Sequence, residues 1–399
     1  MPKKTIQILT VFIFLNFSIY LPAAGFFPFP AYLLDIFILT YILIYYMNKK
    51  LHLPIGNIFF LWLFYFLLMN IIYFIFSPSG AEEHALLKVI VFLIIVYTYM
   101  IFLFSLDDAN LTITRSTLIF VAPLASFTLG LDYFNPGIFS FDAGYQVIQG
   151  RAASFYQNAN YAGTSMIIFL ILGIDMVPKK FRILFLLIIF LGLFFTMSRS
   201  NLLTFFIIVL ILFYQKKLYT KQLFLSMSII IFFFIWLSTS GLDYLSEQYN
   251  LEITDNMKSR VDFFADNESS NTDDMNKRKE ILHDALEIFK DNPIWGGGLG
   301  STLFWEHPVG PHNTFAMLWA DQGLFGMLLI PLLFFLATYN IFKYGNKEQK
   351  QLAILFIIAY TISCFFSHGR LSNITAIAFI TIIASIGYNT KRLYFQGKL

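Results

Sequence analysis

Residues 57–76 read NIFFLWLFYFLLMNIIYFIF, twenty consecutive residues without a charged side chain. An α-helix needs about 20 apolar residues to cross the ~30 Å hydrocarbon core of a bilayer. Lipid offers backbone amides no hydrogen-bond partner, so a stretch of this kind crosses the membrane as a helix. The stretch therefore predicts a membrane-spanning helix.

The composition of the whole chain agrees with this prediction. Hydrophobic residues make up 58% of the 399 residues and charged residues only 13%, whereas soluble domains carry about 25% charge. These values exclude a soluble globular protein, a disordered chain and a nucleic-acid binder. They predict an all-α polytopic membrane protein.

Eleven further apolar runs bring the predicted number of transmembrane helices to about twelve. Two of them, at 182–197 and 200–215, are short and separated only by Met197-Ser198-Arg199, so they could also form one bent unit. The predicted spans are 5–22, 30–47, 57–76, 88–105, 113–130, 162–178, 182–197, 200–215, 222–240, 325–343, 351–367 and 373–390. Residues 1–24 could also be read as a signal peptide, but the many following spans favour an uncleaved first helix.

The basic residues indicate the orientation of these spans. Short cytoplasmic loops are enriched in Lys and Arg. With the N-terminus inside, the predicted inner segments hold 17 of the 27 basic residues, and the short outer loops hold almost none. Both termini are therefore expected in the cytoplasm, with residues 241–312 outside it.

The chain divides into three predicted regions. Residues 1–240 hold transmembrane helices 1–9, residues 241–324 form a long extracytoplasmic loop, and residues 325–399 hold helices 10–12 and a cytoplasmic tail. Within residues 241–312 there are 14 acidic and 6 basic residues. From Met275 to Asp291 the apolar residues recur at helical spacing, which predicts an amphipathic helix within the loop. Long loops with structure of their own are usually functional, so the working site is expected here.

Several arginines are predicted at the outer ends of spans or in this loop. The planar guanidinium of arginine grips phosphate oxygens with paired hydrogen bonds at any relevant pH. Each arginine also has a simpler interpretation, as an interface anchor or part of a solvated face. Together they suit a phosphate or pyrophosphate ligand, and the candidates are Arg151, Arg199, Arg260, Arg278 and Arg370.

His312 is the most distinctive histidine, because it follows Pro-Gly-Pro at a predicted helix start where Asn313 is a suitable N-cap. A metal site built from His312 with Glu306 and His307 is not favoured, because two prolines and a glycine prevent them from sharing a helix face. The run from Gly296 to Gly300 lacks the Lys-Ser/Thr of a P-loop, and predicts a turn with close backbone approach.

These residues resemble the O-antigen ligase and polymerase superfamily of bacterial membrane glycosyltransferases. The strongest motif is His312-Asn313, nine residues, then Gly323-Leu324-Phe325-Gly326 directly before a span. Supporting segments are the helix carrying Arg278, the Thr196–Arg199 stretch and the Arg151–Asn160 stretch.

The resemblance implies a multi-pass protein of the bacterial inner membrane with its active site on the extracytoplasmic face. It implies a donor glycan on undecaprenyl pyrophosphate and an acceptor sugar hydroxyl, on lipid A core for a ligase or on another lipid-linked glycan for a polymerase. No metal or other cofactor is expected. By the same resemblance Arg151, Arg199, Arg278 and Arg260 bind the donor and His312 is the catalytic base; Arg370 is added from the residues alone. The histidine motif favours a ligase, and a polymerase of O-antigen, capsule or exopolysaccharide remains the alternative.

A polysaccharide transporter or flippase is a further alternative for twelve spans. Such proteins often have two matching halves and polar groups near the bilayer midplane. Here the long loop follows the ninth predicted span, and the arginines are predicted at one face of the membrane. Glycosyl transfer is therefore the favoured function.

Overall fold

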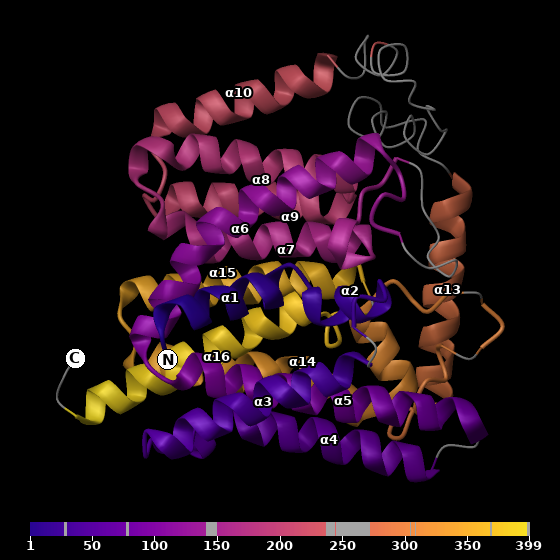
Figure 1. The fold of residues 1–399 in the computed structure, drawn as a ribbon. Coiled ribbons are helices and arrows are strands. Elements are labelled where there is room, and N and C mark those ends of the chain that lie inside the picture. Colours follow the sequence, from indigo (N-terminus) through magenta and orange to yellow (C-terminus); the bar gives the residue numbers. More distant parts are fainter. Residues whose placement is uncertain are drawn as a thin grey trace. The chain divides into compact units, whose positions relative to one another are not determined.

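A computed structural model describes residues 1–27, 30–76, 80–140, 150–236, 244, 272–303, 305–307, 309–367 and 369–396. Within these residues the chain forms α-helices and short 3-10 helices and no strands (Figure 1). The prediction of an all-α protein is confirmed for the described part of the chain.

Six described helices are long and apolar enough to cross a membrane. They are Ala31–Asn48, Leu86–Ser105, Asp108–Phe134, Ala159–Met176, Thr314–Tyr344 and Ile374–Phe395. A seventh is counted if Lys3–Phe14 and Phe17–Ala23, which meet at a 66° bend, form one span. The protein is therefore a multi-pass membrane protein.

The predicted number of twelve spans is not confirmed. Three predicted spans form α8 (Arg182–Thr196), α9 (Arg199–Tyr214) and α10 (Thr220–Trp236), which have 15, 16 and 17 residues. At 1.5 Å per residue such helices rise by about 23–26 Å, less than the ~30 Å hydrocarbon core. Helix length, not apolar character, separates them from the six longer helices.

The helices belong to two compact units. The first unit comprises Met1, residues 30–112 and residues 273–399, and the second comprises residues 2–29 and 113–272. Each unit combines segments that lie far apart in the sequence.

The first unit is built around α16 (Ile374–Phe395), which packs against α5 (Gly80–Ser105) and α14 (Thr314–Tyr344). The unit also contains α3 (Ala31–Asn48), α4 (Phe59–Phe76), α13 (Thr272–Asp291) and α15 (Lys347–Phe365). Figure 1 shows α13 running across the direction of α4, α5 and α14. The predicted amphipathic helix at Met275–Asp291 is thus confirmed as α13.

Aromatic side chains of α4 bind backbone carbonyls of α14. Trp62, Tyr65 and Tyr73 donate hydrogen bonds of 2.8 Å to the carbonyl oxygens of Leu329, Phe325 and Gln322. Since these three side chains lie three and eight residues apart, they share one face of α4. The apolar stretch that predicts a membrane helix therefore also fixes the part of α14 that contains its glycine motif.

The second unit contains α1 (Lys3–Phe14), α2 (Phe17–Ala23), most of α6 (Asp108–Phe134), α7 (Ala159–Gly173), α8, α9 and α10. Almost every side chain of α7 is buried, and α7 packs against α8 and α9. α7 is therefore the central helix of this unit, and the segments before α7 and between α8 and α9 lie at the starts of packed helices.

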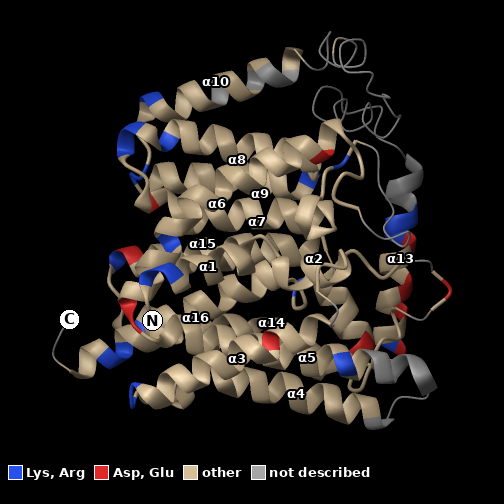
Figure 2. Ribbon diagram, in the orientation of Figure 1, with Lys and Arg blue, Asp and Glu red and all other residues tan. Residues whose placement is uncertain are grey.

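Charged residues gather at the helix ends in each unit (Figure 2). In the second unit Arg115 and Lys217 lie 3.5 and 2.6 Å from the Asp175 carboxylate. Asp175, a rare acidic residue beside a predicted span, thus has a structural explanation as an ion-pair partner. The basic residues of this end are those predicted to face the cytoplasm.

Candidate active site

A polar cluster in the second unit joins the two segments that carry Arg151 and Arg199. The Arg151 guanidinium donates to the Asn160 side-chain oxygen at 2.9 Å and to the Thr196 carbonyl at 3.4 Å. Ser198 Oγ donates to the same Asn160 oxygen at 3.1 Å. We call Arg151, Asn160, Ser198, Arg199 and Asn201 the arginine–asparagine cluster.

Asn201 completes the cluster from the first turn of α9. Its side-chain amide donates to the Asn160 carbonyl at 3.1 Å and to Ser198 Oγ at 2.9 Å. A Cβ atom added at Gly163 would lie 2.4 Å from the Asn201 amide nitrogen if nothing moved, so the glycine leaves room for this side chain. The asparagines therefore hold the starts of α7 and α9 together.

Backbone contacts fix the same two segments. The Ala152 amide donates to the Phe195 carbonyl at 2.9 Å, and the amides of Ala153 and Ser154 each donate to the Asp132 carboxylate at 2.8 Å. Met197, with φ of 48°, turns the chain between α8 and α9. The arginines thus project from a backbone that is already ordered.

The electrostatics of this cluster favour an anion. α7 and α9 both begin here, and helix N-termini carry partial positive charge. At the start of α7 the Asn158 side chain already accepts from the amides of Asn160 and Tyr161. Arg199 is the first residue of α9 and is half-buried, as is Arg151. The Arg151 guanidinium lies at these helix starts, and a guanidinium can bind phosphate oxygens with paired hydrogen bonds.

In the first unit, His312 is half-buried directly before the start of α14. The Asn313 side-chain oxygen accepts from the amides of Phe315 and Ala316 at 2.9 and 3.1 Å. Asn313 is therefore the N-cap of α14, as predicted. This cap fixes the backbone that carries His312.

Gly323 breaks α14 within the predicted motif. Its φ of 53° and ψ of −139° are non-helical, so the carbonyls before it are free for other partners. The backbone amide of Gly297 donates a hydrogen bond to the Ala320 carbonyl at 2.7 Å, and the amide of Gly298 donates to the Asp321 carbonyl at 3.0 Å. The glycine-rich turn at 296–300, predicted to permit close backbone approach, docks on this break.

The Asp321 side chain holds the same turn. One carboxylate oxygen accepts from Ser301 Oγ at 2.9 Å and from the Thr302 amide and hydroxyl at 3.0 and 2.8 Å. The other accepts from the Gly300 amide at 3.2 Å. This buried carboxylate thus has a positioning role at the junction of the turn with α14.

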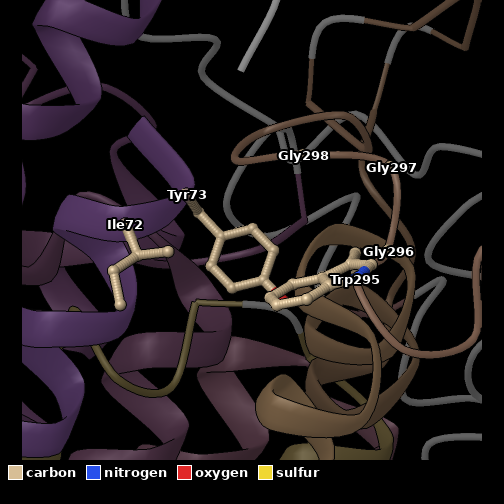
Figure 3. Close-up of a pocket in the computed structure, with 6 residues that line it drawn as sticks. All are labelled: Ile72, Tyr73, Trp295, Gly296, Gly297 and Gly298. Carbon is tan, nitrogen blue, oxygen red and sulfur yellow. The ribbon is translucent and has the colours of Figure 1, made fainter. Parts of the chain in front are cut away.

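An apolar cavity of about 350 Å³ lies beside the glycine-rich turn. It is lined by Ile72 and Tyr73 of α4 and by residues 295–298. Figure 3 shows the Tyr73 ring pointing toward Trp295 and the turn. Trp295 is 60% exposed, and its ring lies 5.5 Å from that of Phe325. The cavity offers a large aromatic surface next to the motif.

α13 packs on the first half of α14 through three small residues, Ala285, Ala316 and Ala320, all buried. Leu282, Ile288 and Trp305 cover this contact. The apolar face expected for the amphipathic helix therefore meets the segment just after His312. Arg278 is exposed on α13.

Arg370 lies between α15 and α16 and is only 1% exposed. Its Nε donates to the Ser363 carbonyl at 3.4 Å, and Tyr360 donates to the Arg370 carbonyl at 2.9 Å. The Thr314 hydroxyl at the start of α14 donates to the Ser367 carbonyl in the same loop. The structure therefore brings the Arg370 loop against the segment following His312, with the arginine buried.

Residues 184–330 match the protein family described as O-antigen ligase. The matched segment covers less than half of the chain, and within it the chain is similar to this family; residues 184–330 are called the O-antigen ligase domain below. The match confirms the resemblance to the superfamily, and with it an O-antigen ligase/polymerase-type membrane protein with glycosyltransferase-like character. None of the curated proteins compared with the chain matches it. Arg151 and Arg370 lie outside the O-antigen ligase domain, which includes Arg199, Arg260, Arg278, His312, Asn313, Gly323 and Gly326.

The predicted site residues fall into separate groups. The second unit holds Arg151 and the segment of Arg199 together, and the first unit holds His312, Arg278 and Arg370. Arg260 lies outside the described residues. Sequence reasoning did not assign roles to Asn160 and Asn201, although each stands within three residues of a helix start.

Proposed function

We propose that the protein transfers a glycan from undecaprenyl pyrophosphate to a sugar hydroxyl at the extracytoplasmic face of the bacterial inner membrane. The observation that carries this proposal is the O-antigen ligase domain in which Asn313 caps α14 beside His312 and Gly323 breaks the same helix. We favour a ligase with lipid A core or a similar glycolipid as acceptor. A polymerase that extends lipid-linked repeat units would use the same chemistry.

In the proposed reaction the acceptor oxygen attacks the anomeric carbon of the donor glycan. A glycosidic bond forms, the bond from that carbon to the phosphate oxygen breaks, and its electron pair leaves with undecaprenyl pyrophosphate. His312 accepts the hydroxyl proton, since the reference pKa of histidine lies near neutrality. The chemistry requires stabilisation of the leaving pyrophosphate and does not itself require a metal.

The arginine–asparagine cluster is the proposed binding site for the donor pyrophosphate. Arg151 is oriented by Asn160 and the Thr196 carbonyl, and Arg199 starts α9. Preorganised donors of this kind stabilise developing negative charge without rearranging during the reaction. Arg278 and Arg260 are proposed to contribute to donor binding from the extracytoplasmic loop, and Arg370 from the loop after α15.

We expect Arg199→Lys to reduce donor binding and transfer at least tenfold, because lysine keeps the charge but cannot form paired hydrogen bonds to phosphate. The effect on donor binding is measured with undecaprenyl pyrophosphate and purified protein, and the effect on transfer is measured in a single-turnover assay. Arg115→Lys is the matched control, since Arg115 pairs with Asp175 at the other end of the same unit. Normal donor binding by Arg199→Lys would leave Arg199 as an interface anchor.

A reconstituted assay tests the proposed reaction. Purified protein in proteoliposomes receives a labelled undecaprenyl-pyrophosphate-linked glycan with either lipid A core or unlabelled lipid-linked repeat as acceptor. We expect label on lipid A core. Label in longer lipid-linked chains would identify a polymerase. Movement of the label across the bilayer without a new glycosidic bond would contradict glycosyl transfer.

Cysteine labelling tests the face of the membrane on which the site lies. Lys290 on α13 is 64% exposed, and Lys347 at the start of α15 is also exposed. We expect Lys290→Cys to react with an impermeant maleimide in intact spheroplasts and Lys347→Cys to react only after lysis. The native Cys364 is buried and gives a low background. The reverse pattern would place α13 in the cytoplasm.

A further inference from the structure

Asp284 of α13 meets a turn that the sequence alone does not pair with it. His307 Nε2 lies 2.7 Å from the Asp284 carboxylate, and one ligand atom each of Asp284, Glu306 and His307 lies within 4.8 Å of the other two. The sequence offers no helix face that Glu306, His307 and His312 could share. The structure supplies the third ligand from α13 instead.

We infer that Asp284, Glu306 and His307 form a binding site for a divalent transition-metal cation such as Zn²⁺. One imidazole and two carboxylates are ligands that Zn²⁺ accepts, with bonds of about 2.0–2.2 Å. Mg²⁺ and Ca²⁺ prefer sets of oxygen ligands, so the imidazole discriminates against them. With three protein ligands, one tetrahedral position is left for water.

The histidine ligand is held in place before any ion binds. The rings of Trp305 and His307 are 4.7 Å apart in an edge contact, and Trp305 packs against the small-residue contact between α13 and α14. Trp305 Nε1 also donates to the Val309 carbonyl at 3.2 Å. The His307 side chain is 16% exposed. The imidazole is therefore fixed in a largely buried position, with its Nε2 directed at Asp284.

The charges in this region favour a cation. Two of the three side chains, Asp284 and Glu306, are acidic and supply negative charge toward a cation. His283 contacts the second Asp284 oxygen at 3.3 Å and can orient the carboxylate from outside the ligand set. Glu306 is exposed and can turn toward an ion.

A bound cation would join α13 to the turn that carries Glu306 and His307, and His307 lies five residues before His312. The expected consequence is stabilisation of the 305–312 segment, because the ion cross-links it to a packed helix. This role is independent of the glycosyl-transfer chemistry, and neither His312 nor any arginine is a ligand.

The test uses the full-length protein in nanodiscs after treatment with a chelator. Zn²⁺ alone is titrated against a competing fluorescent chelator, and the melting temperature is measured with and without Zn²⁺. We expect one Zn²⁺ per chain and a higher melting temperature, and no comparable effect of Mg²⁺. The absence of stoichiometric Zn²⁺ binding at micromolar concentrations would overturn the inference.

Variants locate the ion. We expect Asp284→Asn, His307→Gln and Glu306→Gln each to raise the Kd for Zn²⁺ at least tenfold, and Asp291→Asn, an exposed change on the same helix, to leave it unchanged. The exposed Glu306 makes Glu306→Gln informative even if a change at His307 disturbs folding. The exposed side chains of His283 and Glu287 lie 3.5 Å apart and are the alternative site. If binding survives in all three ligand variants but is lost in His283→Gln, the ion lies at that alternative site and the inference is wrong.

Discussion

His312→Gln should reduce single-turnover transfer by about 10²–10⁴-fold, the usual effect of removing a positioned general base. Glutamine has a similar size and can donate and accept hydrogen bonds, but it cannot take the acceptor proton at neutral pH. Because Asn313 caps α14 through its own side chain, the helix start should survive the change. Donor binding should also persist, because the arginines are the proposed pyrophosphate ligands.

His52→Gln is the matched control for this experiment, because His52 is exposed in the segment before α4, away from the site residues in the sequence. We expect its transfer rate to equal that of the unchanged protein. Both variants should elute as folded protein with unchanged melting temperatures. If folded His312→Gln turns over at a near-normal rate with saturating donor, His312 is a structural residue of the turn and transfer depends on the arginines.

Local sequence signals predicted a large part of the fold. The amphipathic pattern gave α13, the Asn313 side chain capped α14 as expected, and the glycine-rich run formed the close turn at 296–300. These features depend on neighbours within one helical turn or on conformations that glycine favours. The sequence contains that information directly.

The number of spans was predicted less well, because an apolar run need not form a helix long enough to cross the bilayer. The predicted spans 182–197 and 200–215 form α8 and α9 with nearly the predicted bounds, but these helices have only 15 and 16 residues. Conversely, α14 begins at Thr314, well before the apolar run predicted at 325–343, and continues past the break at Gly323. Caps and breaks, rather than hydrophobicity, determined these bounds.

Pairing between distant segments was the other missing information. Asp321 stands just before the predicted span 325–343, where a charge is unusual, but its role depends on hydrogen bonds from Ser301 and Thr302. Asp284 and His307 are likewise 23 residues apart in sequence. No periodic pattern relates such residues, so their contacts appear only when α13, the turn and α14 are packed together.

Three glycines, Gly323 and Gly326 of the motif and Gly296 of the turn, permit backbone segments to touch. A Cβ atom added at Gly323 would lie 2.5 Å from the Ile294 carbonyl oxygen, and one added at Gly296 would lie 2.6 Å from the Gly323 amide nitrogen. At Gly326 the added atom would collide with the Leu318 carbonyl oxygen across the break. These neighbours are backbone atoms, so no side-chain rotation can relieve the contact.

Gly323→Ala should therefore destabilise the first unit strongly. The Gly323 backbone, with φ of 53° and ψ of −139°, lies in a region that is essentially restricted to glycine and costs another residue about 1–3 kcal/mol, and overpacking typically adds about 1–3 kcal/mol. We expect a lower melting temperature, increased proteolysis near residues 294–302 and loss of transfer. Gly56→Ala is the matched control, since a Cβ atom at Gly56 meets nothing within 4 Å. The contact between the turn at 296–298 and α14 cannot accommodate the added methyl group without a backbone shift. A Gly323→Ala protein with a normal melting temperature and normal transfer would therefore show that this contact is not needed for activity.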